Sequence, residues 1–307
     1  MQDLLRRYGA TLTAAFILLT GFWLLVLVIL PNITLFEASF RPYLPVVDVG
    51  GPKDTYSLNN YAKILDNSVD GSILGIPVHM PVHILTFLLT ITYSALVTIL
   101  CFCLAYPLAF YLSKVVSPRS LPTLFLMLFV PLWVSEVLRA FAWYIILALK
   151  GPLNWLLLTL GLIDAPVRWI AGYDGIIIGL VYTYVLFMVF PIYNAIQSLD
   201  TNQIEAADDL GASWWRIHWR IVLPHAKPGI ASGAVMVFML SAGSLLVPSL
   251  LGSPNSNWFT QTIQQWMLES QDWNTGSAYA FMLLILCTVF VSLVMRVFRV
   301  KLTDIAK

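Results

Sequence analysis

Residues 205–224 read EAADDLGASWWRIHWRIVLP, a polar and charged stretch between two long apolar stretches. Its order is a Glu-Ala-Ala triplet, three residues, a glycine, nine residues, an isoleucine, one residue and a Leu-Pro pair. A segment that only connected its two apolar neighbours would not need this order. The positions that define the pattern are Glu205, Ala206, Ala207, Gly211, Ile221, Leu223 and Pro224.

The first half of this stretch predicts a short helix with a defined start and stop. Asp200 can cap a helix over residues 201–210, because its side chain can accept hydrogen bonds from the first free N–H groups. Gly211 follows where a helix C-cap favours a positive φ. We therefore expect a sharp turn at this glycine.

The second half predicts another short helix. Ser213 can cap a helix over residues 214–222, which Pro224 is expected to end. Trp215 and Trp219 lie four residues apart and share a face. The pair of helices has a shape suited to docking onto something in the cytoplasm, although an ordinary interfacial helix pair has the same pattern.

The composition is that of an integral membrane protein. Of the 307 residues, 59% are hydrophobic and only 11% are charged, whereas soluble domains carry about a quarter charged residues. The net charge of +1 argues against a nucleic-acid partner. Cys101, Cys103 and Cys287 lie in apolar stretches, which favours buried apolar roles over a disulfide or a metal site.

Six windows are long and apolar enough to cross a bilayer, which takes about 20 residues in a helix. Strands of a membrane barrel are about half as long and alternate in polarity, so the predicted fold is all-α. The windows cover residues 10–30, 83–113, 121–149, 175–196, 229–251 and 276–297.

The distribution of Lys and Arg predicts the topology. If the N-terminus is inside, these residues are more frequent in the inside segments, so both termini and residues 205–224 are expected to be cytoplasmic. The largest outside segment, residues 31–82, is expected to combine loop with short strand or helix. In the second outside segment, the run 155–162 predicts an interfacial or re-entrant helix. The predicted division is a cytoplasmic tip with the first span (1–30), an extracytoplasmic loop (31–82), a transmembrane core (83–300) containing the cytoplasmic loop 198–227, and a cytoplasmic tail (301–307).

The spacing within residues 205–224 resembles the cytoplasmic EAA signature of ABC-importer permeases, with every signature position present. The similarity extends from about residue 77 to the C-terminus. Other short sequence segments resemble the spermidine/putrescine branch of these permeases. These segments are residues 131–133 with Arg139 and Trp143, residues 160–163, and residues 272–273.

This resemblance implies a type I importer (MetI-like) fold with six transmembrane helices, in the inner membrane of a bacterium. It implies that Glu205 bonds to a separate ATPase, that Gly211 allows a sharp turn, and that the stretch to Pro224 sets the angle into the next helix. The implied partners are an ATPase dimer, a second, paralogous permease and an extracytoplasmic solute-binding protein, besides the lipid bilayer.

The chain is not expected to be an enzyme. Its sequence contains no Gly-x-x-x-x-Gly-Lys-Ser/Thr phosphate loop. ATP and Mg²⁺ are therefore expected on the partner ATPase, with no cofactor or metal bound by this chain. His79 and His83 are expected to be structural rather than metal ligands.

Candidate residues of a transport pathway centre on the third window. Glu136 and Arg139 stand three residues apart there, and ionisable groups at membrane depth are usually functional. The alternative is an internal ion pair that fixes helix packing. Gly243 and Pro248 interrupt the fifth window, and such breaks commonly line a site. The remaining candidates are aromatic rings that could face an ammonium group and acids of an outer mouth: Trp133, Trp143, Tyr144, Tyr182, Tyr184, Glu269 and Asp272.

The expected function is a permease subunit that imports spermidine, putrescine or a related small cationic solute. Another small organic solute, amino acid-like or phosphonate-like, remains an alternative. A secondary transporter would offer no reason for the spacing in residues 205–224. A polytopic membrane enzyme would need a convergent His, Asp or Ser cluster, which the sequence does not suggest.

Overall fold

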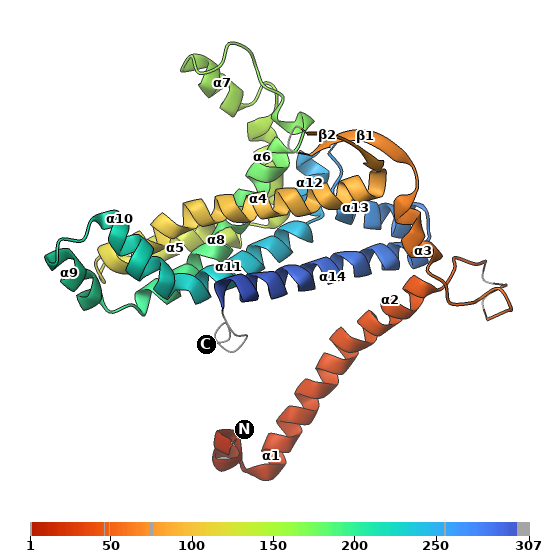
Figure 1. Cartoon of the computed structure of the whole chain (residues 1–307), viewed down its shortest axis with the longest axis horizontal. Helices are drawn as coiled ribbons and strands as arrows, with labels where there is room; N and C mark the ends of the chain where they lie inside the picture. Colours follow the sequence, from red (N-terminus) through yellow and green to blue (C-terminus); the bar gives the residue numbers. More distant parts are fainter. Residues whose placement is uncertain (1, 46, 49, 74–75, 255, 300–307) are drawn as a thin grey trace. The chain divides into compact units, whose positions relative to one another are not determined.

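The computed structural model describes residues 2–45, 47–48, 50–73, 76–254 and 256–299, and they are mostly helical (Figure 1). Six helices are long and apolar enough to cross a membrane, as predicted, over Thr11–Phe40, Val82–Val115, Glu136–Thr159, Asp174–Gln197, Trp214–Ala242 and Trp273–Phe298. The chain divides into two compact units, residues 1–67 with 263–283 and residues 68–262 with 284–307.

The first unit contains α1 (Gln2–Leu24), the π-helical turn η1 (Leu25–Ile29) and α2 (Leu30–Phe40), which follow one another directly. The first span therefore extends ten residues beyond the predicted window, into the segment expected to be a loop. The remaining elements of this unit are α3 (Asn59–Ala62), the 3₁₀ turn η2 (Lys63–Leu65), the π-helical turn η6 (Gln265–Glu269) and the start of α14 (Trp273–Phe298).

An ion pair joins distant parts of the first unit. Lys63 Nζ lies 2.9 Å from Asp272 Oδ2 and donates a second hydrogen bond to Thr275 Oγ1, at 2.6 Å. The Lys63 ammonium also lies 5.2 Å from the centre of the Trp266 ring. Asp272 is only 5% exposed and its carboxylate is paired with Lys63, whereas Glu269 is exposed. The acidic outer mouth that we expect from these two residues stays a prediction.

The second unit holds a bundle of α4 (Val82–Phe110), α8 (Asp174–Gln197) and α11 (Leu223–Ala242). In the core between them lie residues such as Val97, Met188 and Val237, which are fully buried. The other long or apolar elements of this unit are α5 (Leu121–Trp133), α6 (Glu136–Leu147), α7 (Pro152–Thr159), α12 (Leu246–Leu251), α13 (Phe259–Gln264), which continues into the first unit, and most of α14.

Glycines bring α8 and α11 close together. A Cβ at Gly229 would lie 2.3 Å from the backbone oxygen of Pro191, and one at Gly233 would lie 2.6 Å from Met188 Sδ. The two glycines stand four residues apart on one face of α11, the small-xxx-small arrangement that lets membrane helices approach. Helix α14 packs on the same helix through the stacked rings of Phe238 and Phe290, whose centres are 3.5 Å apart.

The third predicted window is not a single helix. Helix α5 ends at Trp133, Val134 and Ser135 are extended, and α6 begins at Glu136. Proline 131 lies in the last turns of α5, where its missing N–H weakens the helix. Glu136 therefore stands in the first turn of a new helix rather than in the middle of a span. Helix α7 lies where the run 155–162 predicted a short helix.

Short elements complete the second unit. Strands β1 (Ser68–Ile73) and β2 (Ile76–Pro81) form an antiparallel hairpin, as the expected mixture of loop and short strand allows. Asp70 pairs with His79 across it, with Oδ1 2.7 Å from Nδ1. The 3₁₀ turn η4 (Trp169–Ala171) precedes α8, and the π-helical turn η3 (Tyr111–Val115) continues α4.

We predict that Gly229→Ala destabilises the second unit, because the added methyl group would overlap a backbone oxygen that no side-chain movement can clear. A loss of about 1–3 kcal/mol is expected for such overpacking, measured as a lower thermal midpoint of the detergent-solubilised protein. Gly21→Ala on α1, where nothing lies within 4 Å of the added atom, is the matched control. Equal midpoints for the two variants would contradict the packing argument.

We predict that Asp272→Asn destabilises the first unit by about 1–2 kcal/mol, less than for a fully buried pair because Lys63 is one-third exposed. Burial raises the pKa of Asp272, but hydrogen bonds from Thr275 and Lys63 outweigh it and hold the pKa below the usual 3.8. The pair is therefore complete at neutral pH and weakens only below that value. Thermal unfolding at neutral pH measures the loss, and an unchanged midpoint would show that the pair adds no stability.

Candidate functional site

The polar segment, defined here as residues 200–224, begins with the predicted helix. Helix α9 (Thr201–Asp209) is capped by Asp200, whose Oδ1 accepts a 3.0 Å hydrogen bond from the backbone N–H of Asn202. Glu205 and Ala206 are exposed on this helix, whereas Ala207 is partly buried and packs toward the core. The expected cap is confirmed, and the triplet presents its first two side chains to solvent.

Gly211 ends this helix in the way its position predicts. Its φ is +75°, in the left-handed region that glycine adopts most easily. Two backbone hydrogen bonds close the turn, from Gly211 N to Asp208 O at 2.8 Å and from Ala212 N to Ala207 O at 3.0 Å, which form a Schellman motif. Nothing lies within 4 Å of where a Cβ would stand, so the backbone conformation rather than crowding requires the glycine.

The prediction of a separate second helix ended by Pro224 is wrong. Helix α10 (Trp214–Ile217) continues through the π-helical turn η5 (His218–Val222) into α11, so one helix runs over Trp214–Ala242. Pro224 therefore lies inside this continuous helix, directly after η5, and such a local π-helical adjustment can accommodate the missing N–H of a proline. Ser213 stands at the N-cap position, but its side chain makes no capping hydrogen bond.

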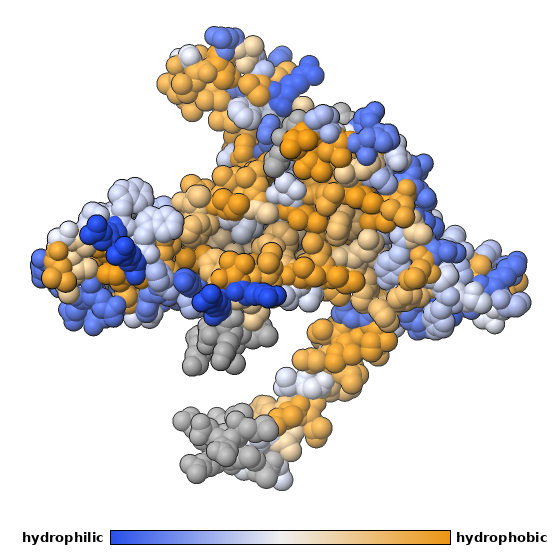
Figure 2. Space-filling view, viewed as in Figure 1, coloured by the Kyte–Doolittle hydropathy of each residue, from blue (hydrophilic) through white to orange (hydrophobic). Residues whose placement is uncertain are grey.

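The polar segment lies at one end of the α4–α8–α11 bundle (Figure 1), and hydrophilic residues gather there (Figure 2). Some large apolar side chains are nevertheless exposed: Leu210 at 88%, Trp215 at 68% and Trp219 at 67%. Ile221 and Leu223 instead pack against the core. The signature positions thus divide between an exposed surface (Glu205, Ala206, Gly211 and Pro224) and partly buried side chains that pack against the core (Ala207, Ile221 and Leu223).

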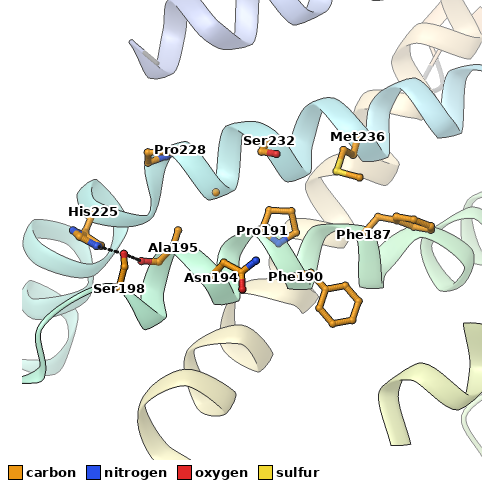
Figure 3. A pocket seen from close by; sticks show the side chains of 11 residues that line it. Phe187, Phe190, Pro191, Asn194, Ala195, Ser198, His225, Pro228, Ser232 and Met236 are labelled. Carbon is orange, nitrogen blue, oxygen red and sulfur yellow. Dashed lines mark hydrogen bonds between the residues drawn. The ribbon is translucent and has the colours of Figure 1, made fainter. Parts of the chain in front are cut away.

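Side chains tie both ends of the polar segment to the bundle. Lys114, in η3, donates a hydrogen bond to the backbone oxygen of Leu199. Ser198 Oγ lies 3.0 Å from His225 Nε2 and donates to the backbone oxygen of Ala195 at 2.8 Å (Figure 3). These contacts hold the end of α8 and the start of α11 together.

A groove of about 610 Å³ lies between α8 and α11 beside these contacts (Figure 3). Its walls are largely apolar, with polar groups from Asn194, Ser198, His225 and Ser232. Pro191 and Gly229 form its floor where the two helices approach most closely. Sequence analysis did not single out these residues, because most of them lie inside the apolar windows 175–196 and 229–251 and the others lie just beyond the ends of those windows.

A second cavity, of about 340 Å³, contains Glu136. Tyr184 donates a 3.3 Å hydrogen bond to Glu136 Oε1. The opposite wall comes from residues 239–246, where α11 ends and the chain turns at Gly243 before α12. The predicted interruption at Gly243 is confirmed, and it places Gly243 and Ser244 beside the carboxylate.

Arg139 does not neutralise this carboxylate directly. Within the described part of the chain, no ion pair joins Arg139 to Glu136, and Arg139 Nε has no hydrogen-bond partner. The alternative of an internal Glu136–Arg139 ion pair is therefore not what the structure contains.

The other predicted pathway residues are dispersed. Trp143 and Tyr182 contact each other edge to face, with ring centres 5.3 Å apart. Trp133 and Tyr144 are 78% and 46% exposed, and none of these four rings lines the Glu136 cavity. In the described residues no group of three His, Cys, Asp or Glu side chains could hold a metal ion.

A family model and individual relatives both match most of this chain. Residues 3–302 match the family described as binding-protein-dependent transport system inner membrane component. The spermidine/putrescine transport system permease protein PotB of Salmonella typhimurium is 33% identical over 288 residues, covering 92% of this chain and 94% of the relative. PotB of Escherichia coli K12 is 38% identical over 164 residues, covering 53% of this chain and 60% of the relative.

Solved structures agree with the fold. A chain of a bacterial ABC transporter for the acidic polysaccharide alginate, in complex with a pentasaccharide-bound periplasmic protein, has a TM-score of 0.72 at 20% identity, covering 98% of this chain and 99% of that one. A chain of the inward-facing methionine transporter MetNI has a TM-score of 0.52 at 16% identity, covering 70% of this chain and 94% of that one.

The family match spans nearly the whole chain. The six candidate membrane helices and the similarity to solved importer structures agree with it. The chain belongs to the family of binding-protein-dependent transport system inner membrane components, and it is a multi-pass inner-membrane permease of an ABC importer.

Proposed function

We propose that this permease imports spermidine, putrescine or a closely related cationic solute. The observation that carries the solute class is the similarity to spermidine/putrescine permeases over 92% of the chain. The Glu136 cavity supports the same class, because its carboxylate has no ion-pair partner among the described residues and lies beside a helix break, which suits an alkylammonium group.

We also propose that the polar segment docks onto a separate ATPase. Glu205 presents a carboxylate at an exposed helix surface, while the partly buried Ala207, Ile221 and Leu223 hold that surface against the bundle. The complete transporter would contain an ATPase dimer, this chain, a paralogous permease and an extracytoplasmic binding protein. ATP and Mg²⁺ would bind to the ATPase.

The continuous helix Trp214–Ala242 supplies a mechanical route for coupling. Its 29 residues span about 43 Å at 1.5 Å per residue. One end carries the polar segment, and the other end stops at Gly243, beside Glu136. Closure of the ATPases on binding ATP would move the first end, and the helix would transmit that movement to the cavity as it changes from inward-facing to outward-facing. Hydrolysis of ATP would then return the cavity to the inward-facing state.

The solute is tested directly on the cognate solute-binding protein, which makes the first selection. Calorimetric titration with spermidine, putrescine, an amino acid and a phosphonate should give binding of the polyamines only. Uptake into vesicles should then require ATP. Binding of another class, or uptake driven by an ion gradient without ATP, would replace this proposal with one of the alternatives.

We predict that Gly211→Asp leaves the chain in the membrane but abolishes uptake. An aspartate at a φ of +75° costs about 1–2 kcal/mol, and it adds a charge to the proposed docking surface. Membrane abundance by immunoblot and uptake of radiolabelled spermidine measure the two effects. Gly211→Asn, which tolerates the left-handed conformation better and adds no charge, should retain more activity, whereas normal uptake by Gly211→Asp would contradict the docking role.

We predict that Glu136→Gln raises the KM for spermidine uptake about 10-fold or more, because a charged hydrogen bond contributes about 1.5–3 kcal/mol. Tyr184 can still donate to the amide oxygen, so packing around the cavity is retained. Glu136→Asp, which keeps the charge, is the control and should change KM less. An unchanged KM in the glutamine variant would remove Glu136 from the pathway.

A further inference from the structure

His218 is a buried polar residue at the edge of an exposed surface. Its neighbours Trp214, Trp215 and Trp219 are more than half exposed, but His218 is only 4% exposed. It is the first residue of the π-helical turn η5, which lies inside the polar segment and leads directly into α11. A buried imidazole needs a hydrogen-bond partner, and its partner lies on a different helix.

That partner is Tyr106 of α4. The Tyr106 hydroxyl oxygen lies 2.6 Å from His218 Nδ1, across 112 residues of sequence. The rings of Phe110 and Trp214 pack on the imidazole, with centres 4.4 and 4.0 Å away. The imidazole is therefore held by a short hydrogen bond and by aromatic contacts from both α4 and its own helix.

Both ends of this hydrogen bond lie where a helix is irregular. Pro107 follows Tyr106 inside α4 and removes one backbone hydrogen bond, and the π-helical turn η3 follows from Tyr111 to Val115. On the other side, η5 begins at His218 itself. Prolines and π-helical turns are the usual places where helices bend, and π-helical turns occur often at functional sites.

We propose that the Tyr106–His218 hydrogen bond transmits movement of the polar segment to α4, so that ATP hydrolysis and solute movement stay coupled. This inference rests on the proposed docking of the polar segment onto an ATPase. Two other contacts described above also connect helices at this end of the bundle. One is the hydrogen bond from Lys114 to the backbone oxygen of Leu199, and the other is the exposed Ser198–His225 pair. The Tyr106–His218 bond is instead a partly buried bond between two side chains, and it joins two helices that each contain a proline or a π-helical turn. His218 and Tyr106 are thus positioning residues rather than part of the solute path.

The test uses the complete transporter, reconstituted with its ATPase, second permease and binding protein in proteoliposomes. Tyr106→Phe removes only the hydroxyl group and keeps the ring. Uptake of radiolabelled spermidine should fall about 5- to 10-fold, the equivalent of one hydrogen bond, while ATP hydrolysis stays within about twofold of wild type. Tyr111→Phe, about one turn later on an exposed side chain, is the control and should leave both rates unchanged.

His218 allows a rescue experiment. In His218→Asn the side-chain amide reaches the position of Nδ1, whereas His218→Leu keeps the volume but has no polar atom. The asparagine variant should retain most of the uptake per ATP hydrolysed, and the leucine variant should lose it. Because both changes remove the same bond, adding Tyr106→Phe to His218→Leu should cause no further loss.

Thermal midpoints of all the variants separate coupling from folding. A fall in uptake and ATP hydrolysis together, in proportion to a lower midpoint, would overturn the proposal in favour of a purely structural bond. Multiplicative losses in the double variant, or an unchanged ratio of uptake to ATP hydrolysis in Tyr106→Phe, would also overturn it. If the wild-type transporter itself shows no ATP-dependent uptake of spermidine, the proposed function fails instead.

Discussion

The close approach of α8 and α11 is the constraint on which the second unit depends. Lipid tails are as apolar as the helix side chains, so the hydrophobic effect contributes little to helix association in a membrane. Close van der Waals packing between helix backbones must stabilise the bundle instead. Gly229 and Gly233 provide that contact by leaving no side chain between α11 and the backbone of Pro191 and Met188. Helix α4 packs against both of these helices, and α12 packs against α8.

The same constraint explains how a polar segment can be both exposed and well placed. Helix α11, which continues the polar segment, packs against α8. Ala207, Ile221 and Leu223 pack the segment itself against the core. Glu205 and Gly211 need no contacts of their own, since the backbone geometry of the Schellman turn positions them. The arrangement holds in place the exposed surface that we propose binds the ATPase.

Local features of the candidate site were predictable from the sequence because their causes are local. Asp200 caps the helix that follows it, and Gly211 takes the positive φ that its position after a helix requires. The break after Trp133 was missed because Val134 and Ser135 carry no charge and Pro131 alone does not end a helix. The continuation past Pro224 was missed because the sequence does not reveal the π-helical turn that directly precedes this proline and can accommodate its missing N–H. The Tyr106–His218 and Lys63–Asp272 contacts join residues 112 and 209 positions apart, for which one sequence holds no pairing signal.

The interruption between α5 and α6 has a consequence for hydration. Thirteen residues of α5 rise about 20 Å, short of the roughly 30 Å hydrocarbon core. If α5 starts at one membrane surface, the extended backbone of Val134 and Ser135 lies at a depth where lipid cannot satisfy its polar groups. Both residues are exposed within this chain. Protein neighbours or water must solvate them. A solvated break next to Glu136 shortens the low-dielectric stretch that an ion would have to cross, so the bilayer is electrically thinner at this point than its thickness implies.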